Sequence, residues 1–255
     1  MEFVDFHKWV YRELGINLLA YKPEQLNRRI NSLMQRNGIS SLEEYKTVIK
    51  NDSEQRQKFL DFITINVTEF FRNPEIFDCL EESIKKELLT KSKNLKVWSA
   101  ACSIGCEPYS LAIMLNRINR NGINTIIATD IDNTILAKAK KGEYTNAEIK
   151  NVKSDELDKF FEKRDDKYYI DDSIKSMVTF RKHDLILDSY ESNFDLILCR
   201  NVVIYFNNDV KEKIYMKFAE SLKPGGLLFV GATESIYKYK EFGFDKLSTF
   251  IYQKV

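Results

Sequence analysis

Small residues follow the first apolar, strand-like run of the chain, in the segment VWSAACSIGCEPYSLA (97–112). They leave room for a ligand close to the backbone. These residues are Ser99, Ala100, Ala101, Ser103 and Gly105. Pro108 suits the first turn of a helix, whose free N–H groups attract an anion. The segment lacks both the GxGxxG and the P-loop pattern. It therefore predicts either a ligand site or a tight turn that binds nothing.

An acid ends the next apolar run, TIIATD (125–130). At its distance from Gly105, the Asp130 carboxylate can accept hydrogen bonds from both hydroxyls of a ribose. Asp132 follows, and an acid after a strand is also an ordinary N-cap for the helical stretch NTILAKAKK. If the ligand reading holds, the ligand contains an adenosyl group, and the pattern does not say which one.

Charge and composition exclude several classes of protein. The 255 residues carry 39 Lys and Arg against 38 Asp and Glu, a net charge of +1, so nucleic-acid binding is a poor interpretation. No uncharged apolar stretch reaches the roughly 18 residues that span a bilayer. The start, MEFVDFHKWV, lacks the apolar core of a secretion signal. We therefore expect a cytoplasmic protein.

The cysteines and histidines do not form a metal-binding pattern. The four cysteines form no CxxC pair, and only two histidines accompany them. These residues are Cys79, Cys102, Cys106, Cys199, His7 and His183. We expect reduced thiols, no disulfide framework and no metal.

The helices and strands that must position Asp130 and Asp132 divide the chain into three predicted parts. Residues 1–65 are predicted to be all-helical, since Leu26, Ile30 and Leu33 recur at helical spacing. Residues 66–92 are predicted to form a linker and a linker helix, which Asn73 and Pro74 begin as N-cap and first residue.

Residues 93–255 alternate β-prone runs with helical stretches. The runs LKVWSAA, TIIATD, FDLILC and GLLFVGA predict a mainly parallel α/β sheet covered on both faces. An insertion over 143–177 combines a charged helix, SDELDKFFEKR, with the alternating run KYYIDDSIKSM, which predicts short antiparallel strands. The last segment, FDKLSTFIYQKV, predicts a final strand or hairpin.

Several segments together resemble the chemotaxis receptor glutamate O-methyltransferases, the CheR family. They are INVTEFFRNP (65–74), VWSAACSIGCEPYS (97–110), IIATDID (126–132), FDLILCRNVVIYF (194–206) and LKPGGLLFVGATES (222–235). Their order covers essentially the whole chain. The resemblance implies an all-α N-terminal domain followed by a Rossmann-like class I methyltransferase domain with a small antiparallel β-subdomain. It also implies methyl transfer from S-adenosylmethionine (SAM) to glutamates of chemotaxis receptors.

The resemblance assigns roles residue by residue. It places the cofactor contacts on Asn66, Thr68, Arg72, Glu107, Asp130, Asp184, Leu185, Cys199 and Arg200. It places Arg72 and Tyr205 beside the methyl group and the incoming carboxylate. Two positions depart from the family pattern. Cys106 replaces the first of two acids, and Asp184 stands where some members have Asn, so it can accept a hydrogen bond from adenine but not donate one.

The chemistry needs no general base. A glutamate side chain, with a pKa of about 4.3, is already ionised at neutral pH. The protein must supply orientation and a dry site, because both charges are neutralised as the bond forms. Arg72 can grip a carboxylate in two hydrogen bonds, which lysine cannot imitate, and that carboxylate belongs either to the cofactor or to the substrate.

Interpretations without a role in catalysis stay open for several of these residues. Arg72 can also pair with Glu69 or Glu75 at the surface, and Thr68 can simply cap a turn. Tyr205 lines the methyl-transfer pocket or is half-buried packing, and Asn201 holds its loop or touches the ligand. Cys199 is expected to act through its backbone, because nothing nearby lowers the pKa of its thiol.

The expected partner is the helical bundle of a receptor. The arginines of the second helix (Arg28, Arg29 and Arg36) form either a solvated face or a docking surface for the acidic receptor helices. In some members of the family that this chain resembles, a glycine-bearing turn of the β-subdomain grips a peptide at the receptor's C-terminal tail. The corresponding turn here, FEKRDDKYYI (161–170), is shorter and lacks glycine, so we expect no tethering to a receptor tail peptide. The protein is expected to be a monomer. Two alternatives are a methyltransferase for another acceptor and a SAM-binding adaptor without catalysis.

Overall fold

The computed structural model describes residues 1–64 and 68–255, which form two compact units. One unit contains the described part of Met1–Asn66 together with Tyr205–Glu212. The other contains the described part of Val67–Ile204 together with Lys213–Val255. Among the described residues, no helix has the length and apolar character needed to cross a bilayer.

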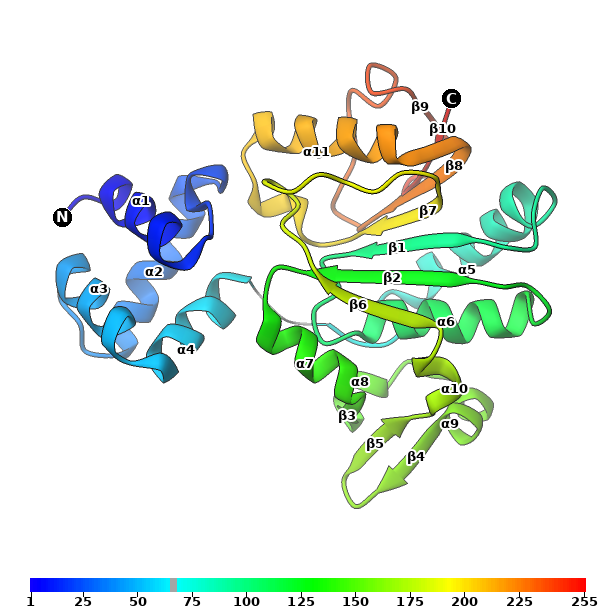
Figure 1. The fold of residues 1–255 in the computed structure, drawn as a ribbon, viewed down its shortest axis with the longest axis horizontal. Helices are drawn as coiled ribbons and strands as arrows, with labels where there is room; N and C mark the ends of the chain where they lie inside the picture. The colour runs from blue at the N-terminus through cyan, green and yellow to red at the C-terminus, as the bar shows by residue number, and fades with distance from the viewer. Residues whose placement is uncertain (65–67) are drawn as a thin grey trace. The chain divides into compact units, whose positions relative to one another are not determined.

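The first unit is a small helical bundle, in which four helices enclose an aromatic core. The helices are α1 (Phe3–Leu14), α2 (Pro23–Arg36), α3 (Leu42–Asn51) and α4 (Ser53–Thr64), with a 3-10 turn at Leu18–Ala20 (Figure 1). The Phe6 ring stacks on Tyr45 at 6.1 Å and meets Phe59 edge-on at 5.9 Å. Ser41 caps α3 by accepting a hydrogen bond from the Glu44 amide at 3.2 Å.

A segment from far along the chain completes this unit. The amide of Lys22 donates to the carbonyl oxygen of Tyr205 at 2.9 Å, and Asn207 donates in the same way to Ala20 at 2.9 Å. The rings of Tyr21 and Phe206 meet edge-on at 5.0 Å. Local periodicity carries no signal for such a pairing, because the two segments are almost two hundred residues apart.

The second unit is built on one mostly parallel sheet (Figure 1). In spatial order its strands are β6 (Val178–Lys182), β2 (Thr125–Asp130), β1 (Lys96–Ala100), β7 (Phe194–Cys199), β8 (Leu222–Val230), β10 (Ile251–Lys254) and β9 (Phe244–Lys246). Every residue of β7 is buried, as expected for a central parallel strand covered on both faces. The β9–β10 pair is an antiparallel hairpin, as its alternating sequence predicted.

Two different groups of elements cover the two faces of the sheet. On one face, Val97 and Leu196 join a core with helices α5 (Pro74–Ser83), α6 (Cys106–Ile118) and α7 (Asn133–Lys141). On the other face, the Trp98 ring meets Phe218 of α11 (Asn208–Ser221) at 5.5 Å. A π-helical turn, Ile84–Leu88, extends α5. This arrangement confirms the predicted Rossmann-like α/β fold.

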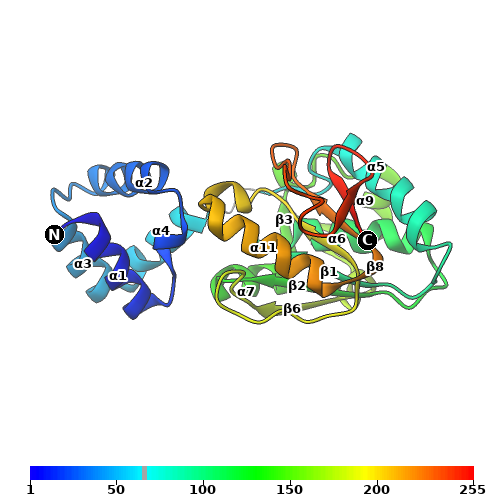
Figure 2. The ribbon, with the colours of Figure 1, turned by 90° about the horizontal axis from the view of Figure 1, so that it is seen from above.

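The insertion forms a second, three-stranded sheet of order β3-β5-β4. Its elements are β3 (Glu143–Thr145), α8 (Asn146–Ile149), α9 (Ser154–Phe160), β4 (Phe161–Arg164), β5 (Lys167–Ile170) and α10 (Asp172–Lys175). Helix α9 lies on the same side of the large sheet as α5 and α6 (Figure 2). The segment FEKR, which we read as the end of the charged helix, is strand β4. Its residues pair with β5 across a turn in which Asp165 has a φ of 51°.

Candidate functional site

The loop between β1 and α6 has a backbone conformation that few residues adopt. Ala101, Ser103 and Gly105 have φ values of 62°, 50° and 88°, in the left-handed region. A Cβ on Gly105 would lie 3.1 Å from the Cβ of Ala139. The amide of Cys102 donates to the carbonyl oxygen of Thr129 at 2.8 Å, which fixes the loop beside the end of β2. Such strain persists where the surroundings fix it, often at functional sites.

Asp130 joins this loop to the end of β2. Its carboxylate accepts hydrogen bonds from the amides of Ser103 at 2.8 Å and Asp132 at 3.1 Å. Burial raises the pKa of Asp130, and the bonds from backbone amides oppose that rise. Asp132 is the residue that caps α7, because its Oδ1 accepts from the Thr134 amide at 2.7 Å. The two acids therefore have separate roles: one caps a helix and the other faces the loop.

Glu107 and Arg200 form a buried charge pair beneath the same loop. The Glu107 carboxylate accepts a 2.8 Å hydrogen bond from the hydroxyl of Ser99 and lies 3.7 Å from Nη1 of Arg200. The Arg200 side chain is 2% exposed, and its guanidinium sits over the rings of Phe77 and Phe229 at 5.3 and 5.1 Å. Burial raises the pKa of Glu107, and the positive charge of Arg200 opposes that rise.

The segment that carries Arg72 is held at both ends. The Phe71 amide donates to the hydroxyl of Ser110 at 2.8 Å, and Phe71 and Asn73 have positive φ values of 46° and 61°. Nη2 of Arg200 donates to the carbonyl oxygen of Arg72 at 2.8 Å and to Oδ1 of Asn73 at 3.2 Å. Asn73 does stand at the N-cap position of α5, but its side chain makes no capping bond there. The predicted N-cap and first-turn positions of Asn73 and Pro74 are confirmed, and the side-chain oxygen of Asn73 binds Arg200 instead of a helix amide.

The charge of Arg72 acts on the acids of this site. Together with Arg200, it opposes the rise that burial causes in the pKa of Glu107. It also contributes to the lowered pKa of Glu69, although the carboxylate of Glu69 bonds directly to Lys150 at 2.6 Å and Asn151 at 3.0 Å. The Glu69 carboxylate is thus held by the insertion.

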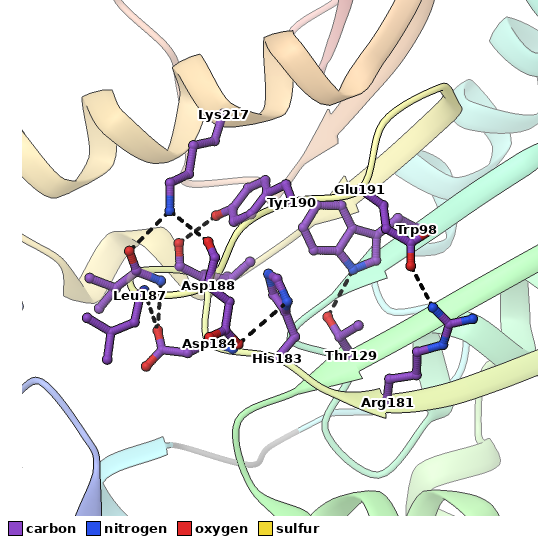
Figure 3. Close-up of polar contacts among 12 residues, drawn as sticks. Trp98, Thr129, Arg181, His183, Asp184, Leu187, Asp188, Tyr190, Glu191 and Lys217 are labelled. Carbon is purple, nitrogen blue, oxygen red and sulfur yellow. Dashed lines mark hydrogen bonds and ion pairs between the residues drawn. The ribbon is translucent and has the colours of Figure 1, made fainter.

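The loop after β6 is tied down by its own backbone and by α11 (Figure 3). The Asp184 carboxylate accepts from the amides of Ile186 at 2.7 Å and Leu187 at 3.2 Å. Lys217 donates to the carbonyl oxygens of Ile186 and Asp188 at 3.1 and 3.0 Å. Sequence reasoning missed Lys217, whose partners are backbone atoms and leave no pattern in the sequence. Leu185, another predicted cofactor contact, is buried.

A cluster of rings lies beside this loop (Figure 3). The indole nitrogen of Trp98 donates to the hydroxyl of Thr129 at 2.9 Å, and the Tyr190 hydroxyl donates to the carbonyl oxygen of Leu185 at 2.6 Å. The rings of Trp98 and Tyr190 meet edge-on at 4.9 Å. His183 packs against both rings, and burial lowers the pKa of its imidazole. The ring contacts and the Tyr190 hydrogen bond thus fix the loop.

The turn after β7 contains two buried polar side-chain atoms that form no hydrogen bond with the described residues. Nε of Arg200 and Oδ1 of Asn201 have no hydrogen-bond partner among residues 1–64 and 68–255. Asn201 also has a φ of 61°. Buried polar atoms of this kind usually bind an ordered water molecule or a polar ligand. Cys199 is fully buried, and burial raises the pKa of its thiol well above the ordinary value, which makes it a poor nucleophile.

Three other residues were predicted to lie at this site: Asn66, Thr68 and Tyr205. Asn66 lies outside the described residues. Thr68 hydrogen-bonds the thiol of Cys106, which is itself buried in the hydrophobic core. Tyr205 belongs to the helical unit, while Arg72 belongs to the α/β unit. Their pairing at a common site therefore stays a prediction. No group of three metal-ligating side chains occurs in the described parts of the chain.

Comparisons with known proteins cover nearly the whole chain. The family model "CheR methyltransferase, all-alpha domain" matches residues 1–64, and "CheR methyltransferase, SAM binding domain" matches residues 66–251. A chemotaxis protein methyltransferase of Listeria monocytogenes is 41% identical over 254 residues, which are 99% of this chain and 97% of the relative. Chemotaxis protein methyltransferase 1 of Pseudomonas aeruginosa is 36% identical over 248 residues, covering 92% and 90% of the two chains.

One solved structure gives a distant likeness to this chain. PKMT2 from Rickettsia typhi in complex with AdoHcy is 19% identical and has a TM-score of 0.37, covering 54% of this chain and 21% of that one.

Proposed function

The chain belongs to the CheR methyltransferase family, and from this premise we propose how its own residues carry out the reaction. It is a SAM-dependent methyltransferase of chemotaxis that forms methyl esters on receptor glutamates. In our proposal, separate sets of residues hold the methyl donor, receive the acceptor and dock the receptor.

The observation that carries the proposal is the convergence of three strand ends. Asp130 ends β2, Glu107 lies in the first turn of α6 directly after the β1–α6 loop, and Arg200 lies in the turn after β7. The contacts of Asp130 with Ser103, and of Glu107 with Arg200, link these ends into one site. In open α/β sheets this carboxyl edge is where ligands bind.

The residues of this edge fit a donor that carries an ammonium, a carboxylate and a ribose. We propose that Glu107 binds the ammonium and that Asp130 binds the ribose hydroxyls, while Asp184 and Leu185 lie beside the adenine. The unsatisfied Nε of Arg200 and Oδ1 of Asn201 suit polar groups of the same ligand. Asn66, Thr68 and the backbone of Cys199 complete the proposed contacts. When bound, SAM supplies an electrophilic methyl group; we propose no metal.

The acceptor is an ionised glutamate, so the protein needs to orient it and not to deprotonate it. We propose that the Arg72 guanidinium holds that carboxylate in two hydrogen bonds and that Tyr205 closes the pocket. Arg200 steadies the Arg72 backbone from inside the fold. Excluding water raises the effect of these charges, because both reacting charges disappear as the ester forms.

We propose that the receptor docks on the exposed arginines of α2, which are Arg28 and Arg36. Arg29 has a different task, since its guanidinium donates to the carbonyl oxygen of Phe62 and lies over the Phe62 ring at 4.6 Å. We also propose that the protein acts as a cytoplasmic monomer and needs no receptor tail peptide.

The test is a methylation assay with radiolabelled SAM and receptor-containing membranes, followed by mild base. A carboxyl ester releases its label as methanol, whereas a methylated nitrogen or carbon retains it. Label that stays on the protein would favour the alternative acceptor. Binding of SAM without any transfer, at any receptor concentration, would favour the adaptor.

A further inference from the structure

The carboxylate of Glu234, a residue that follows β8, accepts hydrogen bonds from three backbone amides. Oε2 accepts hydrogen bonds from Asn201 and Gly231, both at 2.7 Å, and Oε1 accepts one from Val202 at 3.1 Å. Gly231 lies just after β8, and the other two lie just after β7. One side chain therefore joins the ends of two neighbouring strands at the carboxyl edge of the sheet.

This carboxylate is almost completely enclosed. Glu234 is 4% exposed, and burial raises the pKa of its side chain while the three amides and Arg200 oppose that rise. Burying a charge is costly, but this carboxylate satisfies three backbone N–H groups that an apolar side chain would leave without acceptors. The acid therefore fixes the local backbone.

The surrounding backbone is shaped to receive the carboxylate. A Cβ on Gly231 would lie 2.4 Å from Oε2 of Glu234 and 3.0 Å from the amide nitrogen of Asn201, so any other residue would displace one of them. Asn201 keeps its φ of 61°, a conformation that is strained for a residue with a side chain, while its amide is bound.

The turn that Glu234 holds carries Arg200. The guanidinium of Arg200 donates to the carbonyl oxygen of Arg72 and to the side chain of Asn73, and it faces Glu107. A continuous set of contacts therefore runs from Glu234 through the turn to the Arg72 segment. Both carboxylate oxygens of Glu234 accept hydrogen bonds from backbone amides. Any effect of Glu234 on the reaction is therefore transmitted by the residues of the turn.

We propose that Glu234 is a positioning residue for methyl transfer, which fixes the Arg200–Val202 turn and through Arg200 the place of Arg72. The inference rests on the proposed function of Arg72. It predicts that moving the Glu234 carboxylate lowers the rate of transfer more than it lowers binding of the receptor.

The first variant is Glu234→Gln, with Glu241→Gln on an exposed site of the same segment as the matched control. Glutamine keeps the shape but turns an N–H group towards a backbone N–H. We expect kcat at saturating substrates to fall about 10- to 100-fold, because small displacements of a reacting group have effects of this size. The receptor KM should stay within about threefold, and the control should match the wild type. A purely structural role would lower Tm and leave kcat below Tm unchanged.

A double-mutant cycle with Arg200→Lys tests the route of the effect. If Glu234 acts through Arg200, the double variant should be no slower than the slower single variant. Losses that multiply would overturn that route. A kcat for Glu234→Gln within about twofold of the wild type, with esters still formed, would overturn the inference alone. A wild-type protein that forms no ester would overturn the proposed function instead.

Gly231→Ala provides the second variant, in case Glu234→Gln does not fold. It retains the negative charge but forces the carboxylate out of place. A fall in kcat with unchanged receptor KM supports the positioning role, and an unchanged kcat contradicts it.

Discussion

The carbonyl oxygen of Arg72 accepts a 2.8 Å hydrogen bond from Nη2 of Arg200, so two arginines share one buried junction. Like charges repel, and the positive charge of Arg72 indeed contributes to the lowered pKa of Arg200, after burial as the main cause. The arrangement is tolerated because Glu107 supplies a negative charge and the rings of Phe77 and Phe229 face the guanidinium. Arg200 thereby holds the backbone of the segment that carries Arg72.

We predict that Arg72→Lys lowers kcat/KM for receptor methylation about 100-fold, because lysine cannot form a two-pronged contact with a carboxylate. Calorimetry with S-adenosylhomocysteine then identifies which carboxylate is held. An unchanged Kd assigns Arg72 to the substrate glutamate, and a weakened Kd assigns it to the cofactor. Arg120→Lys, on an exposed site, is the control and should change neither kcat/KM nor Kd. A kcat/KM for Arg72→Lys equal to that of the control would remove Arg72 from the mechanism.

Asp130→Asn should weaken binding of S-adenosylhomocysteine about 10- to 100-fold, since hydrogen bonds to a charged group contribute roughly 1.5–3 kcal/mol each. An amide also turns a donor towards the amides of Ser103 or Asp132, which the carboxylate accepts in the native protein. Isothermal titration measures the Kd directly. Asp245→Asn, on the exposed β9, is the matched control. Equal affinities for the two variants would show that Asp130 serves the loop alone.

The sequence predicted the sheet well because its strands are buried on both faces. FDLILC and TIIATD coincide with β7 and β2, since continuous apolar runs of this length have few other structures. The acid at the end of β2 was likewise visible. The N-cap role offered for Asp132 is confirmed, whereas the hydrogen bond from the Ser103 amide to Asp130 depends on a loop conformation that the sequence did not predict.

Contacts between distant segments were the part that sequence could not supply. The bond from Arg200 to Asn73 overrode a plausible capping role, because tertiary partners compete with local ones. The attachment of Tyr205 to Lys22 and the strand conformation of FEKR are of the same kind. Glu234 looked like an ordinary acid after a glycine-rich strand, and only its three amide partners identify it.

The double variant Arg28→Glu, Arg36→Glu should raise the receptor KM about tenfold while the Kd for SAM stays constant, since reversing exposed charges at an interface mainly weakens encounter with an acidic partner. The wild-type KM should also rise with salt. Lys50→Glu, an exposed cation on α3, is the matched control. An unchanged KM at low salt would contradict docking on α2.

Arg29→Glu should behave differently from its neighbours. It loses the bond to the Phe62 carbonyl oxygen, so we expect a lower Tm for the helical unit. A raised KM with an unchanged Tm would instead make Arg29 part of the docking surface.

Arg117 links three helices, and its removal should destabilise the α/β unit. Its guanidinium bonds to Glu81 of α5 and to Glu156 of α9, whose side chain is only 6% exposed. Arg117→Met leaves that carboxylate buried and unpaired, which costs roughly 3 kcal/mol. For a unit of this size, Tm should fall by about 6–12 °C. Arg164→Met, at the exposed pair with Glu162, is the control and should leave Tm unchanged.

The stability that Arg117 contributes should depend on pH. Burial raises the pKa of Glu81, but hydrogen bonds from Lys85 and Arg117 outweigh it, so the folded pKa lies below the ordinary 4.5. A lowered pKa contributes stability above pH 4.5, and that contribution is lost as pH falls through the folded value. Burial raises the pKa of Glu156 despite Arg117, so Glu156 takes up its proton first. The Tm difference between wild type and Arg117→Met should therefore be largest near pH 7 and shrink below pH 4.5. A difference independent of pH would mean that Arg117 contributes through packing alone.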